Sequence, residues 1–338
     1  MQRSGAVVLI LCAAATQGVS SVNATPDPGP SGVLLVANKG DHTLGIIDTA
    51  TGRQVATVEE SGVTGHEVIA SPDGRTAYVP IYGDAGVGRA GTDGQTIDVI
   101  DLASRKRVAT IDLGRGDRPH CPLFGADGRL YVTTEISSTI TVIDPETRKV
   151  VDRIGTDQPE SHMLALTKDG KRAYTSNVGP GTVSVIDLAT KKVVAVIPVS
   201  KKAQRVTLSV DERRLFTADQ TEPRLAVIDT AAHKIEQWIA LPGIAYGTAP
   251  TPDGRWLVMA LLGIDKVGLL DLQTLKLEHT IDVPKTPQEV LMRPDGKVAY
   301  VSCDKSGQVA VIDLEARKLE RMIDTGPGAD GLAWATAP

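Results

Sequence analysis

The sequence predicts an all-β fold, a seven-bladed β-propeller with four antiparallel strands in each blade. Two recurring motifs are the basis of this prediction. The first, I-I-D, V-I-D or L-L-D, ends at Asp48, Asp101, Asp144, Asp187, Asp229, Asp271 and Asp313. The second, S-P-D-G or a variant, carries Asp73, Asp127, Asp169, Asp211, Asp253 and Asp295. Successive aspartates of the first motif are 53, 43, 43, 42, 42 and 42 residues apart, and a period of this size indicates a repeat protein.

Each repeat contains four short runs of β-branched and apolar residues separated by turn residues, as in residues 173–175, 182–186, 193–199 and 206–208. Four such strands in about 42 residues are typical of one propeller blade. The chain has seven V-I-D strands but only six S-P-D-G turns. We therefore expect residues 331–335 to supply the innermost strand of the first blade, whose other three strands begin at Val33. This pairing closes the ring and leaves no open sheet edge.

The N-terminus has the pattern of a secretory signal peptide over residues 1–24. Arg3 supplies the positive charge, residues 6–15 are apolar, and Val22 and Ala24 are the small residues expected before a cleavage site. Residues 25–32, rich in Pro and Gly, form a linker, and the propeller occupies residues 33–338. No second apolar run is long enough to span a membrane. We expect an exported protein, periplasmic or extracellular, that loses Cys12 with its signal.

The composition favours a soluble globular protein: 41% of the residues are hydrophobic and 23% are charged. A net charge of −5 argues against nucleic acid as a partner. Cys121 and Cys303 fall on distant blades, so we expect two separate thiols. The sequence gives no sign of a protein partner, and we expect a monomer.

The repeats resemble a known family. Several strands share a Tyr-Val-containing pattern: Ala77-Tyr78-Val79-Pro80, Leu130-Tyr131-Val132-Thr133 and Ala299-Tyr300-Val301-Ser302. Together with the V-I-D and S-P-D-G motifs that follow them, they are similar to the YVTN β-propeller repeat over about residues 33–335. The resemblance implies the fold. Relatives include surface-layer proteins, lactonase-like enzymes, and propellers similar to those of quinoprotein dehydrogenases and heme d1 nitrite reductases. No C-x-x-C-H occurs, which excludes covalent heme, and the glycines match no nucleotide-binding motif.

One position of the repeat collects polar residues. The residues seven positions before the S-P-D-G aspartates are His66, His120, His162, Gln204, Tyr246 and Gln288. One further step of 42 residues from Gln288 gives Asp330. This ring position starts the innermost strand of every blade, so its side chains are expected around the mouth of the central channel. Strand alternation turns the following residues toward neighbouring blades, although Arg205 and Glu289 remain within reach of the mouth.

Three histidines on consecutive blades beside a carboxylate predict a divalent transition-metal site (Zn, Mn, Cu or Fe) with His66, His120 and His162 as ligands. This arrangement of histidines is similar to the metal site of oligogalacturonate lyases of the propeller type. The alternative is that each histidine caps its own strand or bonds a neighbouring blade.

The remaining candidates surround this mouth. Asp330 and Tyr246 are the predicted catalytic residues. Asp330 would act as a general base or as a fourth metal ligand, and Tyr246 as a proton donor. An insertion of roughly ten residues between Val79 and Ile97 lies on the same face. The predicted substrate-binding residues are Gln204, Gln288, Arg205, Glu289, Tyr82, Arg89 and Glu135.

The function expected from these residues is a metal-assisted lyase or lactonase-type hydrolase acting on a small polar ligand, such as a sugar acid or lactone, at the channel mouth. The alternative is a non-catalytic propeller that binds a protein, a cell-wall sugar or an extracellular polymer. Neither the substrate nor the metal is specified by the sequence.

Overall fold

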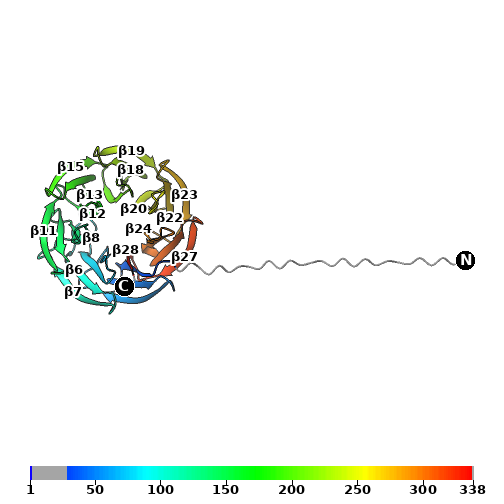
Figure 1. Cartoon of the computed structure of the whole chain (residues 1–338), viewed down its shortest axis with the longest axis horizontal. Coiled ribbons are helices and arrows are strands. Elements are labelled where there is room, and N and C mark those ends of the chain that lie inside the picture. The colour runs from blue at the N-terminus through cyan, green and yellow to red at the C-terminus, as the bar shows by residue number, and fades with distance from the viewer. Residues whose placement is uncertain (2–28, 337–338) are drawn as a thin grey trace.

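The structure, a computed structural model that describes Met1 and residues 29–336, contains seven four-stranded antiparallel sheets arranged around one central axis (Figure 1). The predicted seven-bladed propeller is confirmed. The first three blades, each from the axis outward, are β28 (Ala329–Thr336), β1 (Gly32–Asn38), β2 (Thr43–Asp48) and β3 (Arg53–Glu59); β4 (Ile69–Ala70), β5 (Thr76–Gly83), β6 (Asp93–Asp101) and β7 (Lys106–Asp112); and β8 (Pro119–Phe124), β9 (Leu130–Thr134), β10 (Thr139–Asp144) and β11 (Lys149–Gly155).

The other four blades repeat the same order. They are β12 (Ser161–Leu166), β13 (Arg172–Asn177), β14 (Thr182–Asp187) and β15 (Lys192–Pro198); β16 (Ala203–Leu208), β17 (Arg214–Asp219), β18 (Arg224–Asp229) and β19 (Lys234–Ala240); β20 (Ile244–Pro250), β21 (Trp256–Leu262), β22 (Lys266–Asp271) and β23 (Lys276–Asp282); and β24 (Pro287–Met292), β25 (Val298–Cys303), β26 (Gln308–Asp313) and β27 (Lys318–Asp324). A short 3₁₀ turn, η1 (Asp304–Ser306), follows β25.

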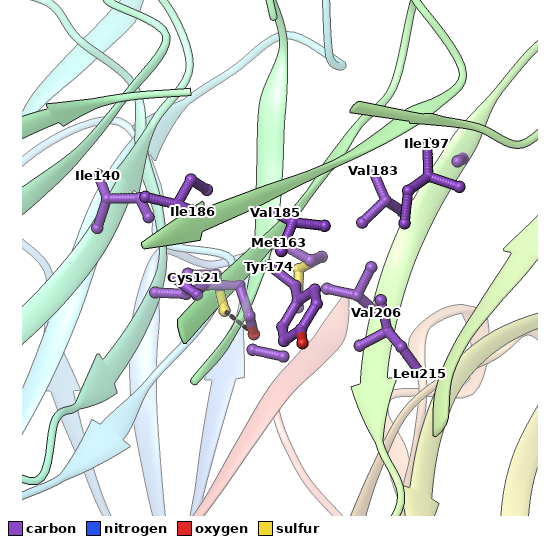
Figure 2. Close-up of a cluster of buried hydrophobic side chains, with 14 of the residues drawn as sticks. Cys121, Ile140, Met163, Tyr174, Val183, Val185, Ile186, Ile197, Val206 and Leu215 are labelled. Atoms are coloured by element: carbon purple, nitrogen blue, oxygen red, sulfur yellow. Dashed lines mark hydrogen bonds between the residues drawn. The ribbon is translucent and has the colours of Figure 1, made fainter. Parts of the chain in front are cut away.

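Burial differs between the middle and outer strands of a blade. The middle strand β14 is buried at four consecutive positions, whereas its outer neighbour β15 alternates between exposed and half-buried residues. Blades pack face to face, so both faces of a middle strand are covered, while the outer strand has one face in solvent. In Figure 2, Met163, Tyr174 and Val206 from two adjacent blades meet in one such interface.

The aspartates of the repeat motifs stabilise the turns. Asp187, which ends β14, accepts a hydrogen bond from the backbone N–H of Thr190 at 2.8 Å, and the next residue, Lys191, has a φ of 57°. Asp and Asn side chains favour turns because they bond backbone groups two or three residues ahead. The motifs thus mark the same turn in every blade.

The ring closes as predicted. β28 pairs antiparallel with β1, with Val33 opposite Ala335 and Leu35 opposite Ala333. The last strand of the chain therefore lies beside its first (Figure 1). The predicted signal peptide and most of the linker lie outside the described residues. Among the residues that are described, no helix is long and apolar enough to cross a membrane.

Cys121 and Cys303 are both buried and neither forms a disulfide, and Figure 2 shows Cys121 among apolar side chains. Burial raises the pKa of both thiols. We expect thiol titration of a chain beginning at Thr25 to find two free thiols after denaturation without a reducing agent. In the native protein we expect both thiols to react slowly. Finding no thiol after denaturation would mean that the cysteines are oxidised, within one molecule or between two.

Candidate functional site

The inner strands are irregular at the ring position. In six blades the pairing register of the innermost strand shifts there: between Pro119 and Pro122, Ser161 and Met163, Ala203 and Val206, Ala245 and Thr248, Pro287 and Val290, and opposite Val36 and Asn38 for β28. In the remaining blade, His66 precedes the short strand β4. Such bulges change the direction in which side chains point. At each bulge, two successive residues of the inner strand no longer alternate strictly between the two faces of the sheet.

The seven ring positions line one pocket of about 140 Å³ at the axis. It is formed by the ring residues His66, His120, His162, Gln204, Tyr246, Gln288 and Asp330, together with Lys39, Tyr82, Gly86, Val87 and Arg205. Six of the sequence candidates outside the histidines therefore lie at this site: Asp330, Tyr246, Gln204, Gln288, Arg205 and Tyr82. Lys39, Gly86 and Val87 were not among the candidates.

The three histidine rings pack against one another instead of converging on a common point. The ring centroids of His120 and His162 are 3.6 Å apart with planes tilted by 33°, and His66 meets His120 edge-on at 5.7 Å. The Tyr82 ring contacts all three, at centroid distances of 4.7, 5.1 and 5.9 Å. In the part of the chain that the structure describes, no three His, Cys, Asp or Glu side chains are arranged to hold a metal ion.

Two imidazole nitrogens in this stack have no hydrogen-bond partner. They are the buried Nδ1 atoms of His120 and His162, whose side chains are each 3% exposed. Burial, reinforced by the cationic Arg205 nearby, lowers the pKa of both imidazoles well below the usual range, and burial lowers that of His66 to about 4. All three rings are therefore neutral at neutral pH. A neutral imidazole has a lone pair on one of its two nitrogens, and that nitrogen can bind a transition-metal centre.

Arg205 lies beneath the histidines as the centre of a buried ion-pair cluster. Its Nη1 atom donates to Glu67 Oε1 at 2.9 Å and to Glu289, and its Nη2 atom is 3.9 Å from Asp330 Oδ1. Glu67 comes from the second blade and Glu289 from the seventh, so these residues meet across the channel. Strict alternation turns Glu67 toward a neighbouring blade, whereas Arg205 and Glu289 were expected within reach of the mouth; the bulges in the inner strands relax this alternation.

The two glutamates of this cluster, Glu67 and Glu289, resist ionisation. Burial raises the pKa of Glu67 and Glu289, and Arg205 only partly counteracts this effect. Lys39 adds a second cation, because its Nζ atom pairs with Asp330 and with Asp304 at 3.0 Å each. Burial disfavours the charged lysine, yet the two aspartates raise its pKa overall.

Tyr246 and Gln204 form the wall opposite the histidines. The Gln204 amide donates to the Tyr246 hydroxyl at 2.7 Å, and the guanidinium of Arg205 lies 4.7 Å from the centroid of the tyrosine ring. Burial raises the pKa of Tyr246, so its phenol is protonated at neutral pH. The side chain can donate a hydrogen bond into the pocket.

The remaining candidates lie around the pocket and not in its wall. Glu135 accepts a hydrogen bond from the Tyr82 hydroxyl, Glu289 binds Arg205, and Arg89 lines a separate pocket beside Glu135. Arg118, which sequence reasoning missed, pairs with Glu135 at 3.3 Å. Its only sequence signal is its place directly before Pro119 and His120. The catalytic and binding roles of the candidates stay predictions.

Fold and pocket together define a β-propeller with a histidine-lined channel mouth. The model of the cytochrome D1 heme domain family matches residues 92–290, and the chain belongs to this family. The YVTN resemblance gave the propeller and named heme d1 nitrite reductases among the relatives, but the matched family is the cytochrome D1 heme domain and not the YVTN repeat. No curated protein matches the sequence.

Three solved structures have the same fold. Hydrazine synthase from Kuenenia stuttgartiensis is 21% identical, with a TM-score of 0.71 over 88% of this chain and 99% of that one. A functionally unknown protein from Desulfotomaculum acetoxidans is 11% identical, with a TM-score of 0.75 over 91% and 100%. Dihydro-heme d1 dehydrogenase NirN in complex with DHE is 17% identical, with a TM-score of 0.66 over 93% and 77%. At these identities the likeness shows the fold alone.

The cofactor expectation is wrong. The sequence suggested a divalent transition metal with no covalent heme and no nucleotide, whereas the chain belongs to a heme-domain family. The physical reason is that C-x-x-C-H reports only covalent attachment. A heme held by an axial side chain and by packing needs no local motif.

Proposed function

We propose that this exported propeller binds a heme-type tetrapyrrole at the channel mouth. The observation that carries the proposal is the pair of buried, neutral imidazoles, His120 and His162, whose Nδ1 atoms have no partner. A buried nitrogen without a hydrogen bond is costly unless a ligand satisfies it. Membership of the cytochrome D1 heme domain family supports an iron macrocycle as that ligand.

The donor chemistry of the pocket fits this group. His120 or His162 would provide a nitrogen ligand for the iron, and Lys39 and Arg205 would provide positive charge that can bind acidic groups of the macrocycle. Tyr246 would hold a proton at its hydroxyl beside the ligand. The bound heme itself would supply redox or ligand-binding chemistry. Nothing in the pocket favours the lyase or lactonase chemistry expected from the sequence.

The enclosed volume sets a condition on binding. Pockets for drug-sized ligands usually measure about 300–1,000 Å³, and this one measures about 140 Å³. A second pocket of about 340 Å³ lies next to it and shares Lys39, His66 and Gly86 in its wall. A macrocycle fits only if the loop that contains Gly86 moves.

The test is a titration of a chain beginning at Thr25 with hemin and with heme d1, followed by absorption spectroscopy. We expect one equivalent to bind with a shifted Soret band, and the double variant His120→Ala, His162→Ala to bind at least tenfold more weakly. His233→Ala is the matched control, because His233 is in a turn outside the pocket, after β18. If neither heme shifts its spectrum with the parent protein, the proposal fails.

A further inference from the structure

The connection between β5 and β6, residues 84–92, separates the histidine pocket from its neighbour. Gly86 and Val87 line the 140 Å³ pocket, while Asp84, Ala85 and Gly86 line the 340 Å³ pocket. We propose that this loop is a movable wall that divides one ligand cavity in two. Lifting it joins the two pockets into a space for a ligand too large for either. The ligand class rests on the proposed function, but the movement does not.

The loop is held to the body of the protein by one buried ion pair. Glu135 Oε1 accepts a hydrogen bond from the backbone N–H of Gly88 at 3.0 Å, and its other oxygen accepts from Tyr82. Arg118 donates from Nη2 to the carbonyl oxygen of Arg89 at 2.7 Å and from Nε to Asp93 Oδ1 at 2.5 Å. Both partners are 3% exposed. The Arg118–Glu135 pair thus binds the middle of the loop and both of its flanks.

Beyond this pair, little packing fixes the loop. Of its nine residues, only Ala85 and Val87 are half-buried and the others are exposed. A further pocket of about 460 Å³ lies along Gly88–Gly91. Segments with few buried apolar contacts open at low cost in free energy. Opening here breaks the two polar anchors and exposes one valine, while the strands below stay paired.

Tyr82 connects the anchor to the site. Its hydroxyl donates to Glu135 while its ring packs against His66, His120 and His162. A substitution at Glu135 therefore affects both the loop and the packing of the histidine rings. Through this contact, a ligand that displaces the histidine rings also disturbs the hydrogen bond between Tyr82 and Glu135 and so favours opening of the loop.

The test compares the reactivity of His120 and His162 toward diethylpyrocarbonate, which modifies neutral imidazoles, by mass spectrometry of the heme-free chain. One variant replaces residues 84–92 with residues 178–181 of the fourth blade, the connection of matching type. We expect modification at least tenfold faster in this variant and several-fold faster in Glu135→Gln, which preserves the side-chain volume. Glu146→Gln, an exposed turn residue, should match the parent.

Equal modification rates in the parent and the shortened chain would overturn the movable wall. If the shortened chain does not fold, equal rates in the parent and Glu135→Gln would do the same. Hemin binding separates this inference from the proposed function. Faster modification without heme binding in any variant supports the wall and refutes the heme proposal. Heme association that is equally fast in the parent and the shortened chain refutes the wall alone.

Discussion

A chain that ends at Gly328 is expected to lose cooperative unfolding. The truncation removes β28, whose Ala329, Leu332, Ala333 and Ala335 are buried. It also leaves the inner edge of β1 unpaired, and a propeller with an open edge exposes a row of unpaired backbone groups. Burying each large apolar side chain contributes about 1.5–3 kcal/mol, and whole domains are stable by only about 5–15 kcal/mol. Losing one strand together with its hydrogen bonds therefore removes most of that margin.

Thermal unfolding followed by circular dichroism checks this expectation. A chain that ends at Thr336 is the matched control, because it retains all of β28, and we expect it to unfold in the same single transition as the parent. A sharp transition at an unchanged temperature in the shorter chain would show that the strand pairing across the termini does not hold the ring together.

The fold was predictable because each blade repeats its turn chemistry. The V-I-D aspartate ends the third strand of a blade in all seven repeats, and from His120 onward a constant spacing of 42 residues locates the ring position without any structural information. Even the strand supplied by the C-terminus followed from counting motifs. Regular repetition of a local rule is the condition under which sequence reasoning works.

The site was predictable only where that regularity continued. His120, His162 and Tyr246 were found by counting, whereas strict alternation alone would turn Arg205 toward a neighbouring blade, and the bulge beside it removes that alternation. Lys39 was missed because its role depends on Asp330, which is 291 positions later in the sequence. Tyr82 contacts all three histidine rings, and no spacing rule predicts that a tyrosine ring will pack against the imidazoles.

The cofactor was the least predictable feature. Three histidines around a channel are consistent with a single ion or with a macrocycle whose iron needs one of them. Spacing along the chain distinguishes these cases only when the ligands are close in sequence, as in zinc fingers. Here each histidine comes from a different blade, and the family match was needed to favour heme.

Replacing Arg205 with Met is expected to be the most destabilising single substitution at the site. The side chain is 4% exposed and pairs with Glu67 and Glu289 across the channel. Removing one partner of a buried pair leaves uncompensated charge and typically costs about 3–5 kcal/mol of the free energy of unfolding. Arg214→Met is the matched control. Arg214 pairs with the exposed Glu236 at 3.1 Å, and such surface pairs contribute about 0–1 kcal/mol.

The pH dependence of the loss identifies its cause. Without Arg205, the folded-state pKa of Glu67 and Glu289 rises further above the ordinary value of 4.5. A carboxyl group with a raised folded pKa destabilises the protein as pH increases from its unfolded pKa through its folded pKa, and this effect disappears at lower pH. Because the folded-state pKa of Glu67 in the parent is already about 8, the difference between Arg205→Met and the parent should be small near pH 4.5, grow as pH rises above 8, and be large at pH 9.5. The triple variant Arg205→Met, Glu67→Gln, Glu289→Gln removes the unpaired charges and should recover most of the stability at pH 9.5. A loss that is the same at both pH values and persists in the triple variant would assign the effect to lost packing around Tyr246 instead of to buried charge.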